Sequence, residues 1–179
     1  MKIAFLPIDN RPVCYTLAKD IAGIDREIEF FIPPRKLLGD LKRVADIEGL
    51  ISWLENLPQI DSLILSLDTL VYGGLIPSRR SKETLEKLQT RLERIKPLLR
   101  NKNVYAFSSI MRISNNNYNE EEKEYWSEYG KKIFDYSFSG GVNRDDIPDE
   151  IIEDYLSTRK RNFTLNKTYL NWQKEGLFN

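Results

Sequence analysis

The segment from Ser62 to Ser81, SLILSLDTLVYGGLIPSRRS, holds the densest group of chemically informative residues in the chain. Residues 62–67 are apolar and typical of a buried strand, and Asp68 stands where that strand is expected to end. A glycine pair, Gly73-Gly74, and the polar run of residues 78–81 then lead into an amphipathic helix. Because the carboxyl ends of parallel strands border the ligand crevice of α/β proteins, a polar site is expected at this place.

The same strand-then-helix pattern extends to both sides of this segment. Residues 2–8, 27–32 and 103–111 are further strand-like apolar runs, and residues 13–24, 40–57 and 81–97 show apolar residues at helical spacing. Ser81 is expected to cap the last of these helices, and Pro97 to kink or end it.

This alternation predicts an α/β fold, a four-stranded parallel sheet with right-handed βα repeats. An open sheet of the Rossmann or flavodoxin type and the first half of a (βα)8-type barrel both begin in this way. Because four strands cannot close a barrel, the open sheet is the prediction and the barrel fragment is the alternative.

The alternation stops near residue 117, and the rest of the sequence is typical of helices. Helical segments are expected at residues 118–136, 148–161 and 164–177. The first has an aromatic side (Tyr125, Trp126, Tyr129), which indicates a core or a docking face. Two parts are therefore expected: a parallel α/β domain at residues 1–117, and a helical extension at residues 118–179 that packs on it.

Composition excludes several classes of function. The 179 residues include 27 Lys plus Arg and 27 Asp plus Glu, so the chain has no overall attraction to nucleic acid or to an anionic membrane. The first apolar run is too short for a signal sequence or a membrane span, and one cysteine, Cys14, fits a reducing cytoplasm. We therefore expect a cytoplasmic protein with no nucleic-acid or membrane partner.

The sequence contains no histidine, which limits its chemistry. His-dependent triads, His general bases and nearly all usual zinc sites are excluded within the chain. The glycine pair matches neither GxGxxG nor a P-loop, so no nucleotide fingerprint is present. We expect no metal and no cofactor.

Polar residues follow each predicted strand and should converge at one edge of the sheet. Two carboxylates beside several guanidinium groups could bind a polyol, a carboxylate or a phosphate. Simpler interpretations remain open, in which Asp9 caps the first helix, Asp68 stabilises its own loop and the glycine pair serves only a turn. The residues in question are Asp9, Asn10, Arg11, Arg35, Asp68, Tyr72, Gly73, Gly74, Ser78, Arg79 and Arg112.

Three of these stretches resemble motifs of the DUF4127 family of bacterial proteins. They are LPIDNRPV at Leu6–Val13, LDTLVYGGLIPSR at Leu67–Arg79 and SSIMRIS at Ser108–Ser114. Family members are considerably longer, so the resemblance implies that this chain is the N-terminal portion of a larger protein whose remaining part is its partner. Trp172, Leu177 and Phe178 are then expected to be poorly buried. The resemblance implies no established function.

The leading hypothesis for function is a hydrolase acting on a carbohydrate or a similar polar small molecule. Glycoside hydrolysis can run on a carboxylate pair alone, which would be Asp9 and Asp68. Substrate binding would fall to the remaining motif residues, Asn10, Arg11, Tyr72, Gly73, Gly74, Ser78, Arg79 and Arg112.

Two other functions remain open. One is a non-catalytic domain that binds a phosphorylated or carboxylated molecule through the loop of residues 73–81 and the N-terminus of the helix after it. The other is an interaction domain whose motifs only fix the fold.

Overall fold

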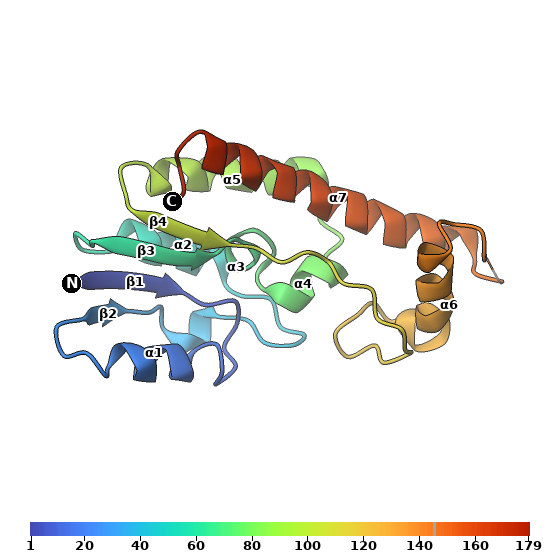
Figure 1. Cartoon of the computed structure of the whole chain (residues 1–179), viewed down its shortest axis with the longest axis horizontal. Coiled ribbons are helices and arrows are strands. Elements are labelled where there is room, and N and C mark those ends of the chain that lie inside the picture. Colours follow the sequence, from blue (N-terminus) through green and yellow to red (C-terminus); the bar gives the residue numbers. More distant parts are fainter. Residues whose placement is uncertain (145) are drawn as a thin grey trace.

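Four short strands form one sheet, in the order β2-β1-β3-β4 (Figure 1). The structure is a computed structural model that describes residues 1–144 and 146–179. The strands are β1 (Lys2–Leu6), β2 (Glu29–Phe31), β3 (Ser62–Ser66) and β4 (Val104–Phe107), and each pair of neighbours is parallel. The predicted four-stranded parallel α/β fold is therefore confirmed.

The strand order decides between the open sheet and the barrel. β1 lies between β2 and β3, whereas strands of a (βα)8 barrel are neighbours in the order in which they follow one another along the chain. The barrel alternative is therefore wrong. An order in which β1 is central, with β2 on one side and β3 and β4 on the other, is the doubly wound arrangement.

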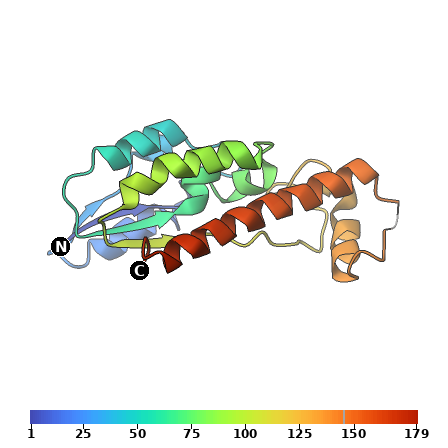
Figure 2. The ribbon, with the colours of Figure 1, turned by 90° about the horizontal axis from the view of Figure 1, so that it is seen from above.

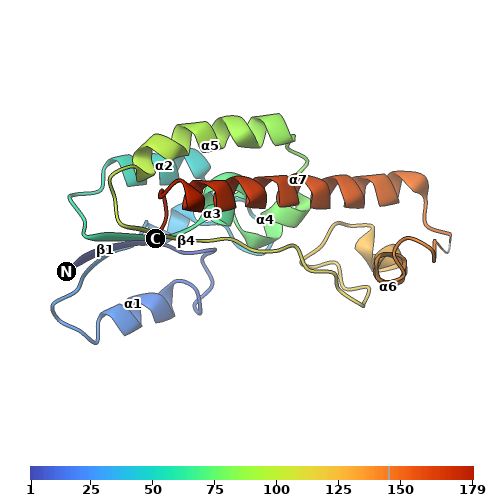
Figure 3. The same ribbon diagram turned by 45° about the horizontal axis from the view of Figure 1, so that its top comes forward.

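One face of the sheet packs against most of the helices. Alternate strand residues, among them Ala4, Leu6, Leu63, Leu65 and Val104, are buried there. Helices α2 (Ile47–Glu55), α5 (Leu85–Leu99) and α7 (Asp149–Lys174) cover this face, and α1 (Thr16–Ala22) lies on the other (Figure 3). Buried leucines and isoleucines of α2 and α5 complete this main core.

Three predicted helices begin later or end earlier than the sequence pattern indicates. α1 covers only part of residues 13–24, and α2 begins at Ile47 because the Asp46 side chain accepts a hydrogen bond from Gly49 N at 3.0 Å. Thr84, and not Ser81, caps α5 by accepting from Lys87 N at 3.3 Å. Pro97 lies in the last turn of α5, which ends two residues later at Leu99, as predicted.

The loop expected after β3 is instead two short helices. α3 (Leu67–Tyr72) begins directly at the end of the strand, where the Ser66 hydroxyl accepts from Thr69 N at 3.2 Å, and α4 (Leu75–Arg80) follows the glycine pair. A short 3-10 helix, η1 (Arg35–Leu37), precedes α2. The strand therefore ends before Asp68, which lies in the first turn of α3.

The C-terminal part contains α6 (Trp126–Phe138) and α7. The break expected after residue 161 is absent, and α7 runs continuously along the length of the molecule (Figure 2). Its first half builds a second, smaller core with Trp126 and Ile133 of α6, while Leu165, Tyr169 and Trp172 join the main core. After β4, the described residues contain no further strand, as predicted, but the helix predicted over residues 118–136 begins only at Trp126, the first residue of α6.

The C-terminal residues pack onto the main core. Trp172 and Phe178 are buried, so the expectation of poorly buried aromatic residues here is wrong for both. Asn179 N donates a hydrogen bond to Val104 O at 2.9 Å, which places the last residue beside β4. Among the described residues, no helix combines the length and the hydropathy that a membrane crossing needs.

Candidate functional site

The strand order places a topological switch point between β1 and β3, and ligands of open α/β sheets bind outside the strand ends at such a point. Asp9 follows β1 and Asp68 follows β3, so the two carboxylates border this position. The loops here are tied together: the Thr69 hydroxyl donates to Pro7 O at 2.8 Å, and Asn10 N donates to Gly39 O at 3.0 Å.

Asp9 is engaged by its own loop. It is buried, and its carboxylate accepts from Arg11 Nε at 2.8 Å and from Arg11 N at 3.0 Å. It does not cap α1, whose N-cap residue Tyr15 makes no capping side-chain bond. Burial and the nearby Asp9 raise the pKa of Cys14 to about 11, so this thiol is neutral and a poor nucleophile at physiological pH.

Asp68 is a deeply buried carboxyl group. It is 2% exposed and accepts a hydrogen bond from Ser109 N, in the segment after β4, at 2.7 Å. Burial raises its pKa to about 6, although the Ser109 amide and the Arg79 guanidinium act in the opposite direction. Asp68 can therefore hold or release a proton near neutral pH.

Two tyrosines lie near Asp68 with their hydroxyl groups buried. Among the described residues, neither Tyr72 Oη nor Tyr169 Oη has a hydrogen-bond partner. Burial raises the pKa of both, and the negative charge of Asp68 adds to the effect. The Arg161 guanidinium lies 5.5 Å from the centre of the Tyr72 ring.

The glycine pair and Ser78 serve the local backbone. Gly73 and Gly74 have φ of 83° and 136°, and they form the turn between α3 and α4. The Ser78 hydroxyl donates to Leu75 O at 2.6 Å inside α4. These contacts match the turn interpretation of the glycine pair. In them, Gly73, Gly74 and Ser78 present no free polar group to a ligand.

The arginines predicted at the sheet edge meet two glutamates that the sequence analysis did not select. Glu121 and Glu122 lie in an irregular segment, residues 119–124, which we call the acidic strap. Arg79 Nη1 is 3.1 Å from Glu122 Oε1 and 3.4 Å from Glu121 Oε2, and Arg112 Nη2 is 2.8 Å from Glu121 Oε2. The strap therefore brings Arg79 and Arg112 together. The run of glutamates at residues 120–122 was the available sequence signal for it.

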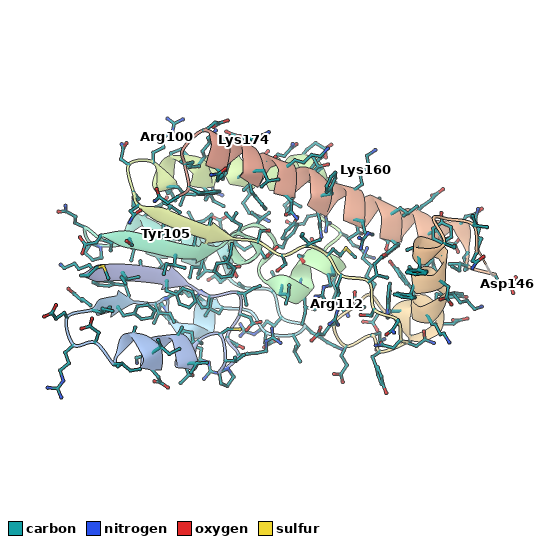
Figure 4. All side chains as sticks on the ribbon, in the orientation of Figure 1. Arg100, Tyr105, Arg112, Asp146, Lys160 and Lys174 are labelled. Carbon is teal, nitrogen blue, oxygen red and sulfur yellow. The ribbon has the colours of Figure 1, made fainter. Side chains whose placement is uncertain are left out.

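Arg11 and Asn10 contribute less directly to this cluster of arginines and glutamates. Arg11 is held mainly by Asp9, which raises its pKa, and Glu121 makes a smaller contribution in the same direction. The Asn10 carbonyl accepts from Arg35 Nη2 at 2.7 Å, so Arg35 joins the loops after β1 and β2. Arg112 lies in the extended segment after β4 (Figure 4).

A comparison with protein-family models supports the family resemblance of the motifs at this edge. The family model described as "Protein of unknown function (DUF4127)" matches residues 3–179. The chain belongs to the DUF4127 family. Comparisons with curated proteins and with solved structures give no match.

A second polar region of this DUF4127 chain lies between the N-terminal end of α5 and the middle of α7. It is a cleft of about 580 Å³. Four cations line it together with two carboxylates and several hydroxyl groups: Lys82, Lys123, Lys160, Arg161, Glu83, Asp154, Ser81, Thr84, Ser157, Thr158 and Thr164.

The two carboxylates of this cleft are already paired. Glu83 Oε1 is 2.8 Å from Arg91 Nη2, and Lys123 Nζ donates to Asp154 Oδ2 at 2.6 Å. In the part of the chain that the structure describes, Lys82 and Lys160 form no ion pair, and both are exposed. Lys160 projects from α7 into solvent (Figure 4).

Arg161 forms the buried end of the cleft. Its guanidinium donates to Ser78 O at 2.8 Å, to Ser81 O at 2.7 Å and to Glu83 O at 3.0 Å, and Asn162 Oδ1 accepts its remaining N–H groups. All of these acceptors are neutral, so the charge is hydrogen-bonded without an adjoining carboxylate. Burial lowers the pKa of Arg161.

The described residues contain no group of three or more His, Cys, Asp or Glu side chains that could hold a metal ion.

Proposed function

We propose that this DUF4127 chain binds a small anionic molecule, phosphorylated or carboxylated, in the cleft between α5 and α7. The observation that carries the proposal is the charge of the cleft. Four cations and two carboxylates line it, the carboxylates are paired, and Lys82 and Lys160 have no ion-pair partner among the described residues. Its volume, about 580 Å³, lies in the range typical of small-molecule sites.

The N-terminus of α5 adds to this electrostatic preference. The first backbone N–H groups of a helix have no intrahelical acceptor and carry a partial positive charge, which favours anions. Thr84 accepts from Lys87 N, and the hydroxyls of Ser81 and Thr164 stand in the same cleft. A phosphate or carboxylate placed here could accept hydrogen bonds from amide, hydroxyl and ammonium groups together.

The position of Arg161 favours an anion over a neutral sugar. Its guanidinium is hydrogen-bonded only to neutral acceptors, and Glu83 and Asp154 act on it only through space, so a positive field remains that a neutral polyol does not compensate. The cleft also includes the N-terminus of α5. The sequence analysis named this helix N-terminus in its alternative hypothesis of anion binding. We therefore place the ligand's acidic group near Lys82, Lys160 and the start of α5.

The test compares ligands of different charge on lysine variants. In isothermal titration, the protein should bind inorganic phosphate or a sugar phosphate more tightly than the corresponding neutral sugar. Lys82→Gln and Lys160→Gln should each weaken this binding about tenfold, since a charge-assisted hydrogen bond contributes about 1.5–3 kcal/mol. Lys19→Gln, which removes an exposed charge from α1, is the matched control. Equal affinity for neutral sugars, or an unchanged affinity in both cleft variants, would contradict the proposal.

A second candidate function is hydrolysis at the switch point, and the pKa of Asp68, about 6, favours it. A carboxyl group that is partly protonated near neutral pH can act as the general acid of a carboxylate pair. Asp9 would be the second carboxylate. If Asp68 is the acid, Asp68→Asn should abolish turnover of a glycoside without lowering the melting temperature. Full turnover at a lowered melting temperature would contradict the catalytic role.

A further inference from the structure

The acidic strap fills an arginine site with the protein's own carboxylates. Glu122 is buried, and its Oε1 lies 3.1 Å from Arg79 Nη1 and 3.5 Å from Arg112 Nε. Glu121 Oε2 contacts the same two arginines at 3.4 Å and 2.8 Å. Each glutamate therefore bridges α4 and the segment after β4.

Arg80 holds the backbone of the strap in place. Its guanidinium donates to the carbonyl groups of Asn119, at 3.4 Å, and of Glu122, and it forms an ion pair with Glu124 at 2.5 Å. The strap has no regular secondary structure, so its position depends on these side-chain contacts. The pair between Arg80 and the exposed Glu124 is of the weak surface type, whereas the pair between Arg79 and Glu122 is buried, so displacing this irregular segment requires that the buried arginine gain another anionic partner.

The glutamates use only part of the donor capacity of Arg79. All of its contacts to the strap run through Nη1, while Arg79 Nε is buried and has no hydrogen-bond partner among the described residues. A guanidinium binds a carboxylate or phosphate best through two parallel N–H groups, and a buried donor without a partner is costly. A free ligand can adopt that bidentate geometry, whereas two glutamates fixed in one short segment do not.

We propose that Arg79 and Arg112 form an anion site for a small dicarboxylate, and that Glu121 and Glu122 occupy this site when no ligand is bound. The two acidic groups of the ligand would replace the two glutamate carboxylates. Arg79 would then pair side-on through Nε and Nη2, and the strap would leave the sheet edge. The two arginines of this site lie outside the α5–α7 cleft, although Lys123 of the strap also lines that cleft, where it pairs with Asp154.

The first test removes the two glutamate carboxylates that compete with a ligand for the arginines. Malonate binding is measured in the Lys82→Gln/Lys160→Gln background, at constant ionic strength maintained with chloride, so that the cleft does not contribute. Adding Glu121→Gln and Glu122→Gln together should tighten malonate binding about tenfold, and Arg112→Gln should then abolish the gain. Glu120→Gln, a change of the exposed neighbouring glutamate, is the matched control and should leave binding unchanged.

The second test uses the unaltered strap, in case the double glutamine variant does not fold. Saturating malonate should speed hydrogen exchange at the amides of residues 119–124 and leave exchange in α2 unchanged. Two results would overturn the proposal: malonate binding in the double variant no tighter than in the Glu120→Gln control, or strap exchange that malonate does not alter.

Discussion

Asp68 shows how one buried carboxyl group makes stability depend on pH. In the folded protein its pKa is about 6, whereas an unfolded aspartate titrates near pH ~3.9. The folded state therefore binds this proton more tightly than the unfolded state does. The resulting stabilisation is fully present below pH ~4 and is lost as pH rises through about 6.

We expect Asp68→Asn to remove this loss of stability with rising pH. As pH rises from 4 to 7, the free energy of unfolding of the variant should increase relative to that of the unaltered protein by up to about 3 kcal/mol. Urea denaturation across this range measures the difference, and Asp20→Asn, at an exposed position of α1, is the control. A constant difference between Asp68→Asn and the unaltered protein over the whole range would mean that the carboxyl group is not shifted.

For single residues, the sequence predicted where the polar side chains stand relative to the strands better than it predicted which groups they contact. Asp9, Asp68 and Arg112 follow strands as expected, because an apolar run followed by a polar residue marks a strand end. Asp9 pairs with Arg11 in its own loop, but the contacts of Asp68 with Ser109 and of Arg79 with Glu122 join segments 41 and 43 residues apart in the chain. No local pattern specifies such contacts.

Among the elements, α7 connects the two cores. Ile152 and Tyr155 lie in the smaller core and Leu165 and Tyr169 in the larger one, with helical spacing maintained throughout. The residues between them that face inward are polar, Thr158, Arg161 and Asn162. This polar interval in the apolar stripe led to the prediction of two helices. The hydrogen bonds of Arg161 and Asn162 to α4 and its following loop satisfy these groups and allow one continuous helix.

Arg161 should therefore be a major contributor to the docking of α7. Replacing it with methionine removes the side-chain donors to the carbonyl groups of Ser81 and Glu83 and leaves Ser78 O with Asn162 Nδ2 alone. We expect Arg161→Met to lower the free energy of unfolding by about 3 kcal/mol or more, measured by urea denaturation. Arg159→Met, which removes a partly exposed arginine of the same helix, should cost less than about half as much. Equal losses would show that the buried hydrogen bonds are not the cause.

In the whole molecule, the two faces of the sheet differ in how well they are covered. The face under α2, α5 and α7 is buried, whereas Tyr105 and Phe107, alternate residues of β4, are 48% and 39% exposed on the other face. Tyr105 is labelled in Figure 4. α1 buries none of its residues, and its apolar residues Leu17 and Ile21 are 49% and 58% exposed. Helical periodicity in residues 13–24 predicted this helix correctly, but periodicity does not show whether another element covers the apolar side.

The stability of the described fold should therefore depend little on the apolar residues of α1. Leu17→Ser and Ile21→Ser should each change the free energy of unfolding by less than about 0.5 kcal/mol. Leu165→Ala, in the main core, should cost about 2–5 kcal/mol. Thermal unfolding of the three variants at one concentration checks the contrast, and a large loss in the α1 variants would place that helix within the core.

The central claim, that an anion binds between α5 and α7, is tested most directly by an NMR titration of backbone amides with inorganic phosphate. Saturable shifts should concentrate at residues 82–86 and 157–164, and they should disappear in the Lys82→Gln/Lys160→Gln protein. Phosphate-dependent shifts confined to residues 73–80, or no saturable shift at the start of α5, would contradict the claim.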